Sequence, residues 1–419
     1  MKKILKSTMF CILGILIFSL FPQHGYGVAP FARKFQTSCS TCHVSAPKLT
    51  AFGESFRLNG YQIPEGDEKY IKEKPVSMGA EPWKEVWPNA IWPGGIPGSF
   101  PLGAWILSDV KIPLEGADKE VEFEYPHEVE LFMVGIMGED VPFFVEVEWE
   151  EGEVGAEAWM GFYNLFKSER GLNLRVGSFE INPLPMAFDH LRLGKEHYLY
   201  NNWRVPGSAN RFRLRGGKPG LELNGIVGGR FFYSAGVVSP EGGIDSYGTF
   251  RFKLGGTAYN RSAPTEEAAD KAISALPTGF WVDNAFELAA FAYFGQADVD
   301  GVSDTFNRFG AGARWTFQNL DLSAAYVFGK NNDPFATDLE ADSNAWHVEA
   351  SYYIFPWLIA EARYEELKVE DANDLELLNQ KNTVVGLVWT LRANIKLITE
   401  AVFYKNNNDA FNVRLAFGF

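Results

Sequence analysis

The sequence predicts a mainly β fold: an outer-membrane β-barrel of about sixteen strands that follows a small, mostly helical N-terminal segment. Aromatic residues make up 15% of the 419 residues, and there are 41 glycines, a composition typical of barrels with aromatic girdles. From about residue 102 onwards, apolar residues recur at every second position, as in strands with one face in lipid. In the last such segment Phe411, Val413, Leu415, Phe417 and Phe419 alternate with Asn412, Arg414, Ala416 and Gly418.

Other segments carry the same alternation with charge on one face. Between residues 145 and 150 the even positions are glutamates and the odd positions are apolar. A soluble two-sheet sandwich is the alternative, but it does not need so many long strands with one charged face. The chain ends on Phe419, and a terminal aromatic after an alternating strand resembles the assembly signal of bacterial outer-membrane barrels. Strands are expected to start near residues 102, 122, 142, 155, 172, 211, 229, 247, 282, 307, 320, 344, 357, 381, 394 and 410.

The expected connections alternate in length, as the short periplasmic turns and long outer loops of bacterial barrels do. Longer loops are expected at 182–210, 297–305, 330–343 and 367–380. The segment 258–280 breaks this rule, because it is long although the strand count places it on the periplasmic side. It either contains a helix over residues 266–276 or conceals a further pair of strands. Short turns are expected at 138–140, 318–319, 355–356 and 392–393.

The first 27 residues have the outline of a secretory signal peptide. Three lysines within the first six residues precede an apolar stretch over residues 9–21, and glycines at 25 and 27 permit cleavage after position 27. An uncleaved anchor is the alternative, although the apolar run is short for a membrane span. The expected organisation is a signal peptide over 1–27, a monohaem cytochrome c segment with its linker over 28–100, and a porin-like barrel over 101–419, for the reasons that follow.

Cys39-Ser-Thr-Cys42-His43 is the most specific motif in the chain. C-x-x-C-H is the attachment pattern of c-type haem, in which two thiols bond one porphyrin and the adjacent histidine binds its iron. We therefore expect one covalent haem c on Cys39 and Cys42, with His43 as the proximal ligand of the haem iron. A disulfide is the alternative in an exported protein. A zinc site is a weaker alternative, because no second ligand pair follows at the usual spacing.

A short helix is expected after the motif, opened by Pro47 and ended near Gly60. Leu49, Phe52 and Phe56 lie on one face of it and are expected to pack against the porphyrin, although an ordinary small core has the same pattern. The sixth iron ligand stays open. Met78, the one methionine in residues 28–100, is the first candidate. The others are His127, His190, His197, His347, Met186, or an open or water-bound iron.

The net charge of −15 argues against nucleic acid as a partner. Carboxylates are expected along the lumen and outer loops, where their field attracts cations and their oxygens suit hard metal ions. A solvated polar wall is the plainer interpretation of any single one. The inward candidates are Glu122, Glu124, Glu128, Glu130, Glu146, Glu148, Glu349 and Glu361.

A barrel of this size leaves a lumen unless something fills it. The short haem segment is expected to plug that lumen or lie at its periplasmic mouth, and a domain that hangs in the periplasm is the competing placement. The long 182–210 segment could also fold into the pore. A weakly indicated metal site there would use Asp189, His190, Glu196 or His197.

With these motifs in place, the chain resembles the fused monohaem cytochrome–porins of the bacterial outer membrane, best known from iron-oxidising bacteria. The resemblance rests on Phe31-Ala32-Arg33, Cys39-x-x-Cys42-His43, Pro47-x-Leu49 and Phe52-Gly53-x-x-Phe56-x-x-x-Gly60-Tyr61. It implies a lipid-embedded electron conduit that takes electrons from extracellular Fe(II), or another donor, through the haem to a periplasmic cytochrome. The direction of flow and the true donor stay open, as does an Fe(II) oxidase activity.

Two other functions fit the same sequence. One is a diffusion porin whose haem segment serves as a plug or sensor. The other is a periplasm-facing haem enzyme of the peroxidase kind, which would need an open sixth position on the iron. Electron transfer across a bilayer without leakage of solutes would separate the conduit from the porin.

Overall fold

The computed structural model describes residues 30–63 except 36 and 38, and only short pieces of 64–100. It also describes 101–418 except 115–119, 151–152, 182–183, 185–192, 195–197, 241–242, 261–282, 356, 374, 393 and 406–408. The expected signal peptide, Met78 and the expected helix over 266–276 lie outside the described residues. No helix in the described part of the chain is long and apolar enough to cross a membrane.

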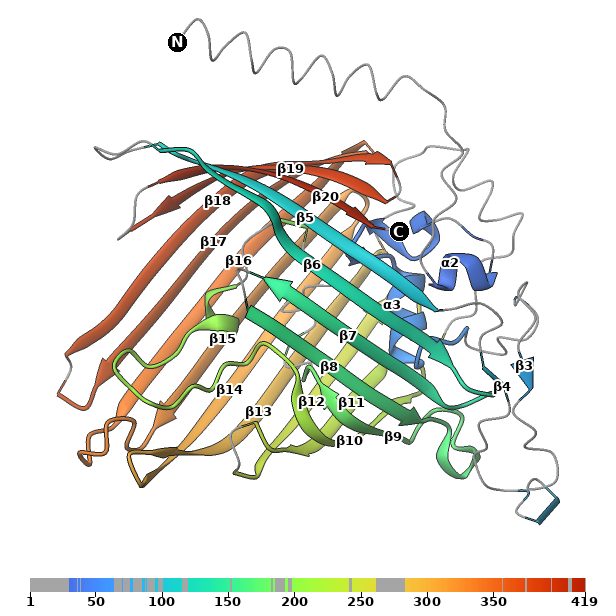
Figure 1. The fold of residues 1–419 in the computed structure, drawn as a ribbon, viewed down its shortest axis with the longest axis horizontal. Helices are drawn as coiled ribbons and strands as arrows, with labels where there is room; N and C mark the ends of the chain where they lie inside the picture. The colour runs from blue at the N-terminus through green and yellow to red at the C-terminus, as the bar shows by residue number, and fades with distance from the viewer. Residues whose placement is uncertain are drawn as a thin grey trace, which may run out of the picture.

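Sixteen antiparallel strands close into one barrel, which confirms the predicted fold class (Figure 1). Each strand pairs with its neighbours in sequence, and the last strand pairs with the first to close the wall. The strands are β5 (Leu102–Pro113), β6 (Glu122–Ile136), β7 (Pro142–Glu150), β8 (Glu153–Phe162), β9 (Asn173–Phe179), β10 (Lys218–Val227), β11 (Phe231–Val238), β12 (Asp245–Gly255), β13 (Ala285–Val299), β14 (Val302–Phe317), β15 (Leu320–Asn331), β16 (Ala341–Phe355), β17 (Leu358–Asp371), β18 (Glu376–Arg392), β19 (Ile395–Tyr404) and β20 (Ala410–Gly418).

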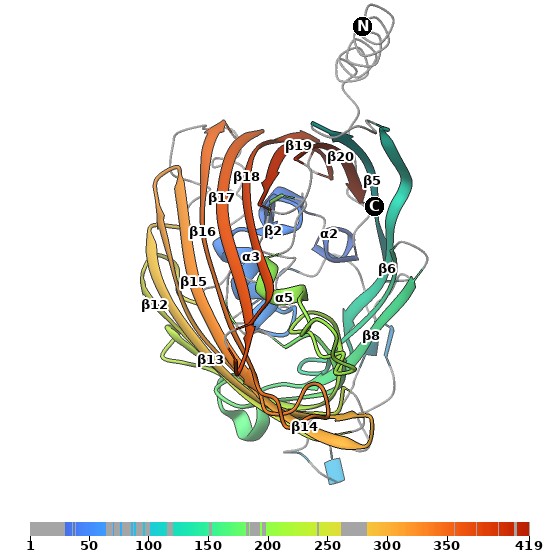
Figure 2. The ribbon, with the colours of Figure 1, turned by 90° about the vertical axis from the view of Figure 1, so that its left-hand side faces the viewer.

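The N-terminal segment forms a few short elements, and Figure 2 shows α2, β2 and α3 inside the ring of strands. They are α2 (Pro30–Phe35), the 3-10 turn η1 (Cys39–Thr41), β1 (His43–Ser45), β2 (Lys48–Leu49) and α3 (Ala51–Leu58). A separate two-stranded sheet pairs β3 (Val76–Ser77) with β4 (Gly95–Ile96). Two further short helices are η3 (Leu165–Lys167) and α5 (Leu199–Asn202), and α5 lies inside the ring of strands (Figure 2).

The two faces of the wall differ in polarity. On β12, Phe250 and Phe252 are 46% and 38% exposed, whereas Arg251 between them is 1% exposed. On β16, Trp346 and Val348 are likewise exposed on either side of a buried histidine. A closed wall with apolar side chains outside and polar ones inside is what a barrel in lipid requires. This excludes the two-sheet sandwich and supports an outer-membrane location.

Most strands start within a few residues of their expected positions, but three do not. The strand expected near 211 starts at Lys218, the one near 307 at Val302, and the one near 381 at Glu376. The first difference has a clear cause. Phe212 and Leu214 alternate like strand residues, but they are 6% and 3% exposed and pack in the lumen rather than in the wall.

Two of the expected outer loops are wrong in length. The loop expected at 297–305 is a two-residue turn, Asp300-Gly301, between β13 and β14. Both residues have positive φ, 52° and 83°, the geometry of a tight hairpin turn in which Asp-Gly is favoured. The loop expected at 367–380 is also short, because β17 runs to Asp371 and β18 begins at Glu376.

The two ends of the barrel can be told apart by their connections. One end, the turn end, carries the tight turns at 228–230 and 318–319 and the C-terminal end of β20. The other, the loop end, carries the long connection 180–217 between β9 and β10. In bacterial barrels the short turns face the periplasm. The turn end is therefore the periplasmic end of a barrel inserted in the usual way.

Candidate haem-attachment site in the barrel lumen

Residues 30–63, hereafter the plug, lie inside the barrel at its turn end (Figures 1 and 2). Lys48 of the plug pairs with Asp321 of β15, with Nζ 2.7 Å from Oδ2 and both side chains buried. The Ser55 hydroxyl donates a 2.6 Å hydrogen bond to the carbonyl oxygen of Tyr259, just after β12. Buried contacts of this kind fix the plug to the wall, so the segment does not hang free of the barrel.

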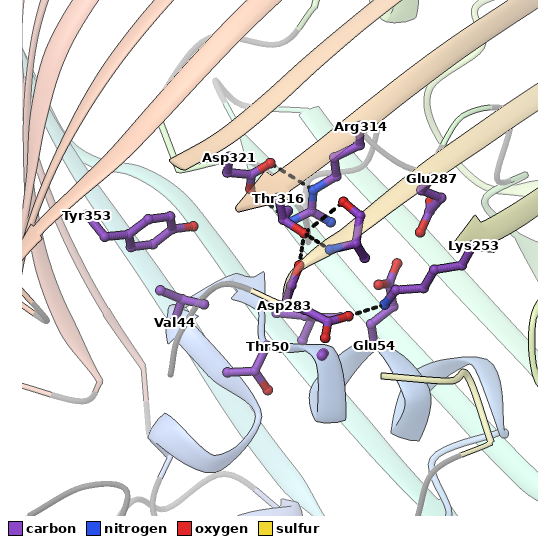
Figure 3. A pocket seen from close by; sticks show the side chains of 13 residues that line it. Val44, Thr50, Glu54, Lys253, Asp283, Glu287, Arg314, Thr316, Asp321 and Tyr353 are labelled. Atoms are coloured by element: carbon purple, nitrogen blue, oxygen red, sulfur yellow. Dashed lines mark hydrogen bonds and ion pairs between the residues drawn. The ribbon is translucent and has the colours of Figure 1, made fainter. Parts of the chain in front are cut away.

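A second buried ion-pair group ties the plug to β12 and β13. Arg251 pairs with Glu54 of the plug and, at 2.8 Å, with Glu287 of the wall. Figure 3 shows Glu54 beside Glu287 and Lys253 at this junction. Burial by itself would raise the pKa of Glu54, but the charges of Arg251 and Lys253 outweigh it and lower the pKa to about 2. Glu54 is therefore ionised and paired at neutral pH.

The C-x-x-C-H turn is held by the helix that follows it. Thr50 is the N-cap of α3, and its hydroxyl accepts a hydrogen bond from the Gly53 N–H at 3.0 Å. The same hydroxyl donates to the Thr41 carbonyl at 3.0 Å, and the Thr50 N–H donates to the Cys42 carbonyl at 2.8 Å. The expected start of the helix at Pro47 is therefore corrected to Ala51, because Thr50 supplies the cap.

Gly53 allows α3 to lie directly against the motif. A Cβ at this position would collide with the carbonyl carbon and oxygen of Cys42. At the other end of the helix, Gly60 has φ +71° just after the C-cap residue Asn59, which confirms the expected glycine end. The spacing of glycines in this segment thus follows from a close approach and a helix end.

We expect Gly53→Ala to lower the haem content and the thermal stability of the plug, because the new Cβ must push α3 away from Cys42. Overpacking of this kind costs about 1–3 kcal/mol. Gly248→Ala on β12 is the matched control, since a Cβ there meets only Ser234 O, at 3.9 Å. Haem per protein, measured as the pyridine haemochrome, checks the effect. Equal haem in both variants would contradict the close packing.

His43 is oriented by the backbone. Its Nδ1 lies 3.1 Å from the carbonyl oxygen of Pro47, and since a carbonyl only accepts, Nδ1 carries the hydrogen. The lone pair is then on Nε2, as in histidines that bind metals while the other nitrogen is held by a carbonyl. Burial lowers the pKa of His43, the hydrogen bond to Pro47 opposes this, and the nearby charge of Lys396 adds to the lowering.

Cys39 and Cys42 are free, partly exposed thiols, the first at the start of the η1 turn and the second directly after its end. Burial raises the pKa of both thiols, and that of Cys42 reaches about 12. A thiol that stays protonated is a poor zinc ligand, because the metal binds the thiolate. Two neighbouring thiols and an adjacent oriented imidazole are the groups that a covalent haem requires.

The three expected packing residues have different surroundings. Phe56 is 4% exposed and packs against Phe31 and Phe35, with ring centroids 4.8 and 5.8 Å away. Leu49 and Phe52 are only partly buried, so they retain surface that another group can cover. Contact of these residues with a porphyrin stays a prediction.

The long connection 180–217, hereafter the inner loop, folds into the lumen where it is described. Leu193 lies in one buried cluster with Val44 of the plug. Tyr198 donates a 3.1 Å hydrogen bond to Glu349 of β16, and Phe212 packs on Tyr293 with centroids 4.6 Å apart. The expectation that this segment enters the pore is therefore confirmed. The plug and the described part of the inner loop therefore meet inside the lumen.

Of the candidates for the sixth iron ligand, His347 and His127 are the ones within the described residues. Tyr353 on β16 lines the same pocket as Val44, next to His43. His347 lies six residues before Tyr353 on β16, which is about 20 Å along a strand. His127 lies towards the loop end on β6. Neither can reach an iron bound to His43. Met186, His190 and His197 lie outside the described residues, as do Asp189 and Glu196 of the expected metal site.

Sequence reasoning found some of the inward acids but missed Glu287 and Asp321, and it missed the cations that pair with them. Glu349 and Glu361 are 6% and 9% exposed, as expected for lumen-facing side chains. Arg251, Arg314 and Lys253 were not singled out, although Arg251 and Lys253 each stand at an inward position between exposed apolar residues. That alternation was the available signal. It shows that a basic residue faces the lumen, but not which acid it meets.

These features define the class of protein as a closed sixteen-stranded, porin-like barrel whose lumen carries a C-x-x-C-H plug. Solved structures share the barrel. OmpT of Vibrio cholerae is 10% identical with a TM-score of 0.52, and the match covers 77% of this chain and 99% of that one. OmpF of Salmonella typhi in complex with daunomycin is 14% identical with a TM-score of 0.51 and coverages of 76% and 97%, and the outer-membrane channel DcaP of Acinetobacter baumannii is 12% identical with a TM-score of 0.50 and coverages of 76% and 96%. No protein-family model and no curated protein matches the sequence. At these identities the similarity is one of fold.

Proposed function

We propose that the protein is an outer-membrane electron conduit of the fused monohaem cytochrome–porin kind. One covalent haem c on Cys39 and Cys42, with His43 as the proximal iron ligand, would pass electrons between an extracellular donor and a periplasmic cytochrome. Fe(II) is the proposed donor, on the resemblance of the motifs. The observation that carries the proposal is the position of Cys39-Ser-Thr-Cys42-His43 inside the barrel at its turn end.

The chain's own residues have definite tasks in this proposal. Bound haem c supplies one-electron chemistry. Pro47 holds His43 in the tautomer whose Nε2 can bind iron. Lys48 and Glu54 fix the plug to the wall, so that the site keeps its place near the periplasmic end. The inner loop excludes bulk water from the same region of the lumen.

The proposal is tested by adding Fe(II) to the purified oxidised protein without oxygen and following the haem absorption bands. Reduction of the haem by Fe(II), and its reoxidation by an added soluble cytochrome, are the expected results. If the haem stays oxidised at both neutral and acidic pH while dithionite reduces it, Fe(II) is not the donor. In that case the protein would still transfer electrons, but it would take them from a donor other than Fe(II).

Lys396 is expected to raise the reduction potential of the site. This buried lysine of β19 donates a 3.1 Å hydrogen bond to the Leu193 carbonyl, and its charge acts on His43. A nearby positive charge favours the reduced form of a bound iron, and about 1 kcal/mol of such interaction is roughly 40 mV for one electron. We expect Lys396→Gln to lower the midpoint potential by tens of millivolts in a redox titration. Lys396→Arg is the control, and an equal drop in both would assign the effect to packing.

A diffusion porin is the second candidate, and its specific support is the barrel shared with OmpF, OmpT and DcaP. The described plug and inner loop argue against a wide channel, since they meet inside the lumen. Liposome swelling in a small neutral sugar separates the two functions. Swelling as fast as with an open porin would favour the second candidate.

A further inference from the structure

A cluster of carboxylates around one histidine lines the barrel far from the plug. His127 lies on β6 between Glu124 and Glu128, towards the loop end. The register between β5 and β6 shifts here, since Leu107 pairs with Glu128 but Asp109 pairs with Glu124. This bulge leaves three residues of β6 opposite one residue of β5. Bulges re-aim side chains, and His127 and Glu128, adjacent in sequence, are both buried at 7% and 5% exposure.

The donor atoms are close enough to share an ion. Asp109, Glu124 and His127 form one group whose ligand atoms all lie within 4.8 Å of one another, and His127, Glu128 and Glu150 form another. A first-row divalent ion with ligands about 2.1 Å away places opposite ligands about 4.2 Å apart. The ligand atoms of each group are therefore spaced closely enough to bind one such ion, and His127 belongs to both groups.

The histidine itself points to a ligand. Its buried Nδ1 has no hydrogen-bond partner among the described residues, although Glu124 Oε2 lies only 2.5 Å away. The Nε2 atom faces Glu150 Oε1 at 3.7 Å. The two nitrogens point to opposite edges of the ring, so only one of them can bind a given ion. Nε2 is the one whose spacing from a carboxylate fits two ligands of a common ion.

Two cations border the cluster. Arg414 of β20 lies 3.5 Å from Asp109, and Arg215 of the inner loop lies 3.5 Å from Glu150. Arg414 thus offsets part of the negative charge beside Asp109, and Arg215 does so beside Glu150. The carboxylates still outnumber these arginines, so the cluster keeps a negative field that favours a cation.

We propose that His127 Nε2, Glu128 and Glu150 bind one divalent first-row transition-metal ion at the loop end of the lumen, while Glu124 and Asp109 border the opposite edge of the imidazole ring. The carboxylates suit Mn(II) and the imidazole suits Fe(II), whereas Cu(I) prefers thiolate and thioether ligands. The proposal that an ion binds here depends only on these side chains. A role for that ion as the electron donor would rest on the proposed function.

Further carboxylates of β6 and β7 lie between this site and the plug. Glu128, Glu130 and Glu148 form a third group of donor atoms within 4.8 Å. Glu130 and Glu148 also line a cavity of about 150 Å³ that reaches Arg57 and Tyr61 of the plug. An acidic track thus leads from the proposed site down β6 and β7 to the plug, which carries the haem-attachment motif.

The experiment titrates the purified full-length protein in detergent with Mn²⁺ and follows the free ion by electron spin resonance. One tight site is expected, and the bound ion should show spin-echo modulation from an imidazole nitrogen. His127→Ala should abolish that modulation and weaken binding by about tenfold or more. Glu128→Gln, which keeps the volume of the side chain, should weaken binding and keep the modulation.

Glu122→Gln is the matched control, because Glu122 lies on the same strand but is half exposed and pairs with Lys111 at 3.2 Å. It should bind Mn²⁺ like the unchanged protein. Equal weakening in Glu122→Gln and His127→Ala would reveal diffuse attraction to acidic residues and overturn the site. Absence of a tight ion, or modulation that survives in a folded His127→Ala barrel, would do the same. No step of this measurement involves the haem, so its failure is distinct from failure of electron transfer.

Discussion

Replacing Cys39 and Cys42 together with alanine is expected to remove all covalent haem and leave the barrel closed. Cys39 begins the η1 turn of the plug and Cys42 directly follows it, so neither thiol belongs to the wall. The wall is closed by its own strand pairing, from β5 round to β20. The plug also keeps its ion pairs at Lys48 and Glu54, so its docking does not depend on the thiols.

Haem staining after denaturing electrophoresis measures this loss, and circular dichroism measures the β-sheet. Ser40→Ala is the matched control, because it alters the motif while both thiols and His43 stay in place. The control should carry the normal amount of haem. Normal covalent haem in the double variant would refute Cys39 and Cys42 as the attachment sites.

Arg251→Leu is expected to release the plug. The arginine is 1% exposed and pairs with both Glu54 and Glu287. Its loss leaves two buried carboxylates without their counter-charge, and breaking a buried pair in this way costs about 3–5 kcal/mol. The open fraction of the barrel should then rise by roughly two to four orders of magnitude. Single-channel recording in planar bilayers should show frequent openings that are rare in the unchanged protein.

Lys330→Gln is the control for this prediction. Lys330 pairs with Glu340 at 2.5 Å, but the two side chains are 38% and 46% exposed. An exposed pair contributes about 0–1 kcal/mol, so the conductance should not change. A closed Arg251→Leu barrel, or equal opening in the two variants, would contradict the role of the buried pair.

The same contacts set the pH range of the closed state. The pKa of Glu54 is lowered to about 2 in the folded protein, so its contribution is complete above the ordinary glutamate pKa of about 4.3. That contribution falls away as pH drops towards 2. Lys48 acts in the opposite sense, because burial lowers its pKa but Asp321 outweighs this and the net shift is upward. Its contribution is lost only at strongly alkaline pH. The barrel should therefore stay closed over a broad neutral range and open first in strong acid.

The barrel could be predicted from the sequence because its signal is local. Alternation at every second residue specifies both a strand and its two faces, and the buried His347 between the exposed Trp346 and Val348 bears this out. Where alternation has another cause, the prediction is wrong. Phe212 and Leu214 alternate because they pack inside the lumen, so the strand after them was placed too early.

The residues of the site likewise fall into those that the sequence reveals and those that it does not. Cys39, Cys42 and His43 are contiguous, so the sequence shows them together. Glu54 and Arg251 are almost two hundred residues apart, and nothing near either residue indicates the other. The inward turn of His127 is also invisible to a rule of alternation, because a bulge in β6 breaks the period at that place.

The most direct test of the conduit is electron transfer across a sealed membrane. The protein is reconstituted into liposomes that enclose oxidised cytochrome c, and Fe(II) is added outside. We expect the enclosed cytochrome to be reduced without leakage of a small sugar, and to stay oxidised when Cys39 and Cys42 are alanines. An enclosed cytochrome that stays oxidised with the haem-loaded protein, or that is reduced equally by the haem-free variant, would contradict the conduit.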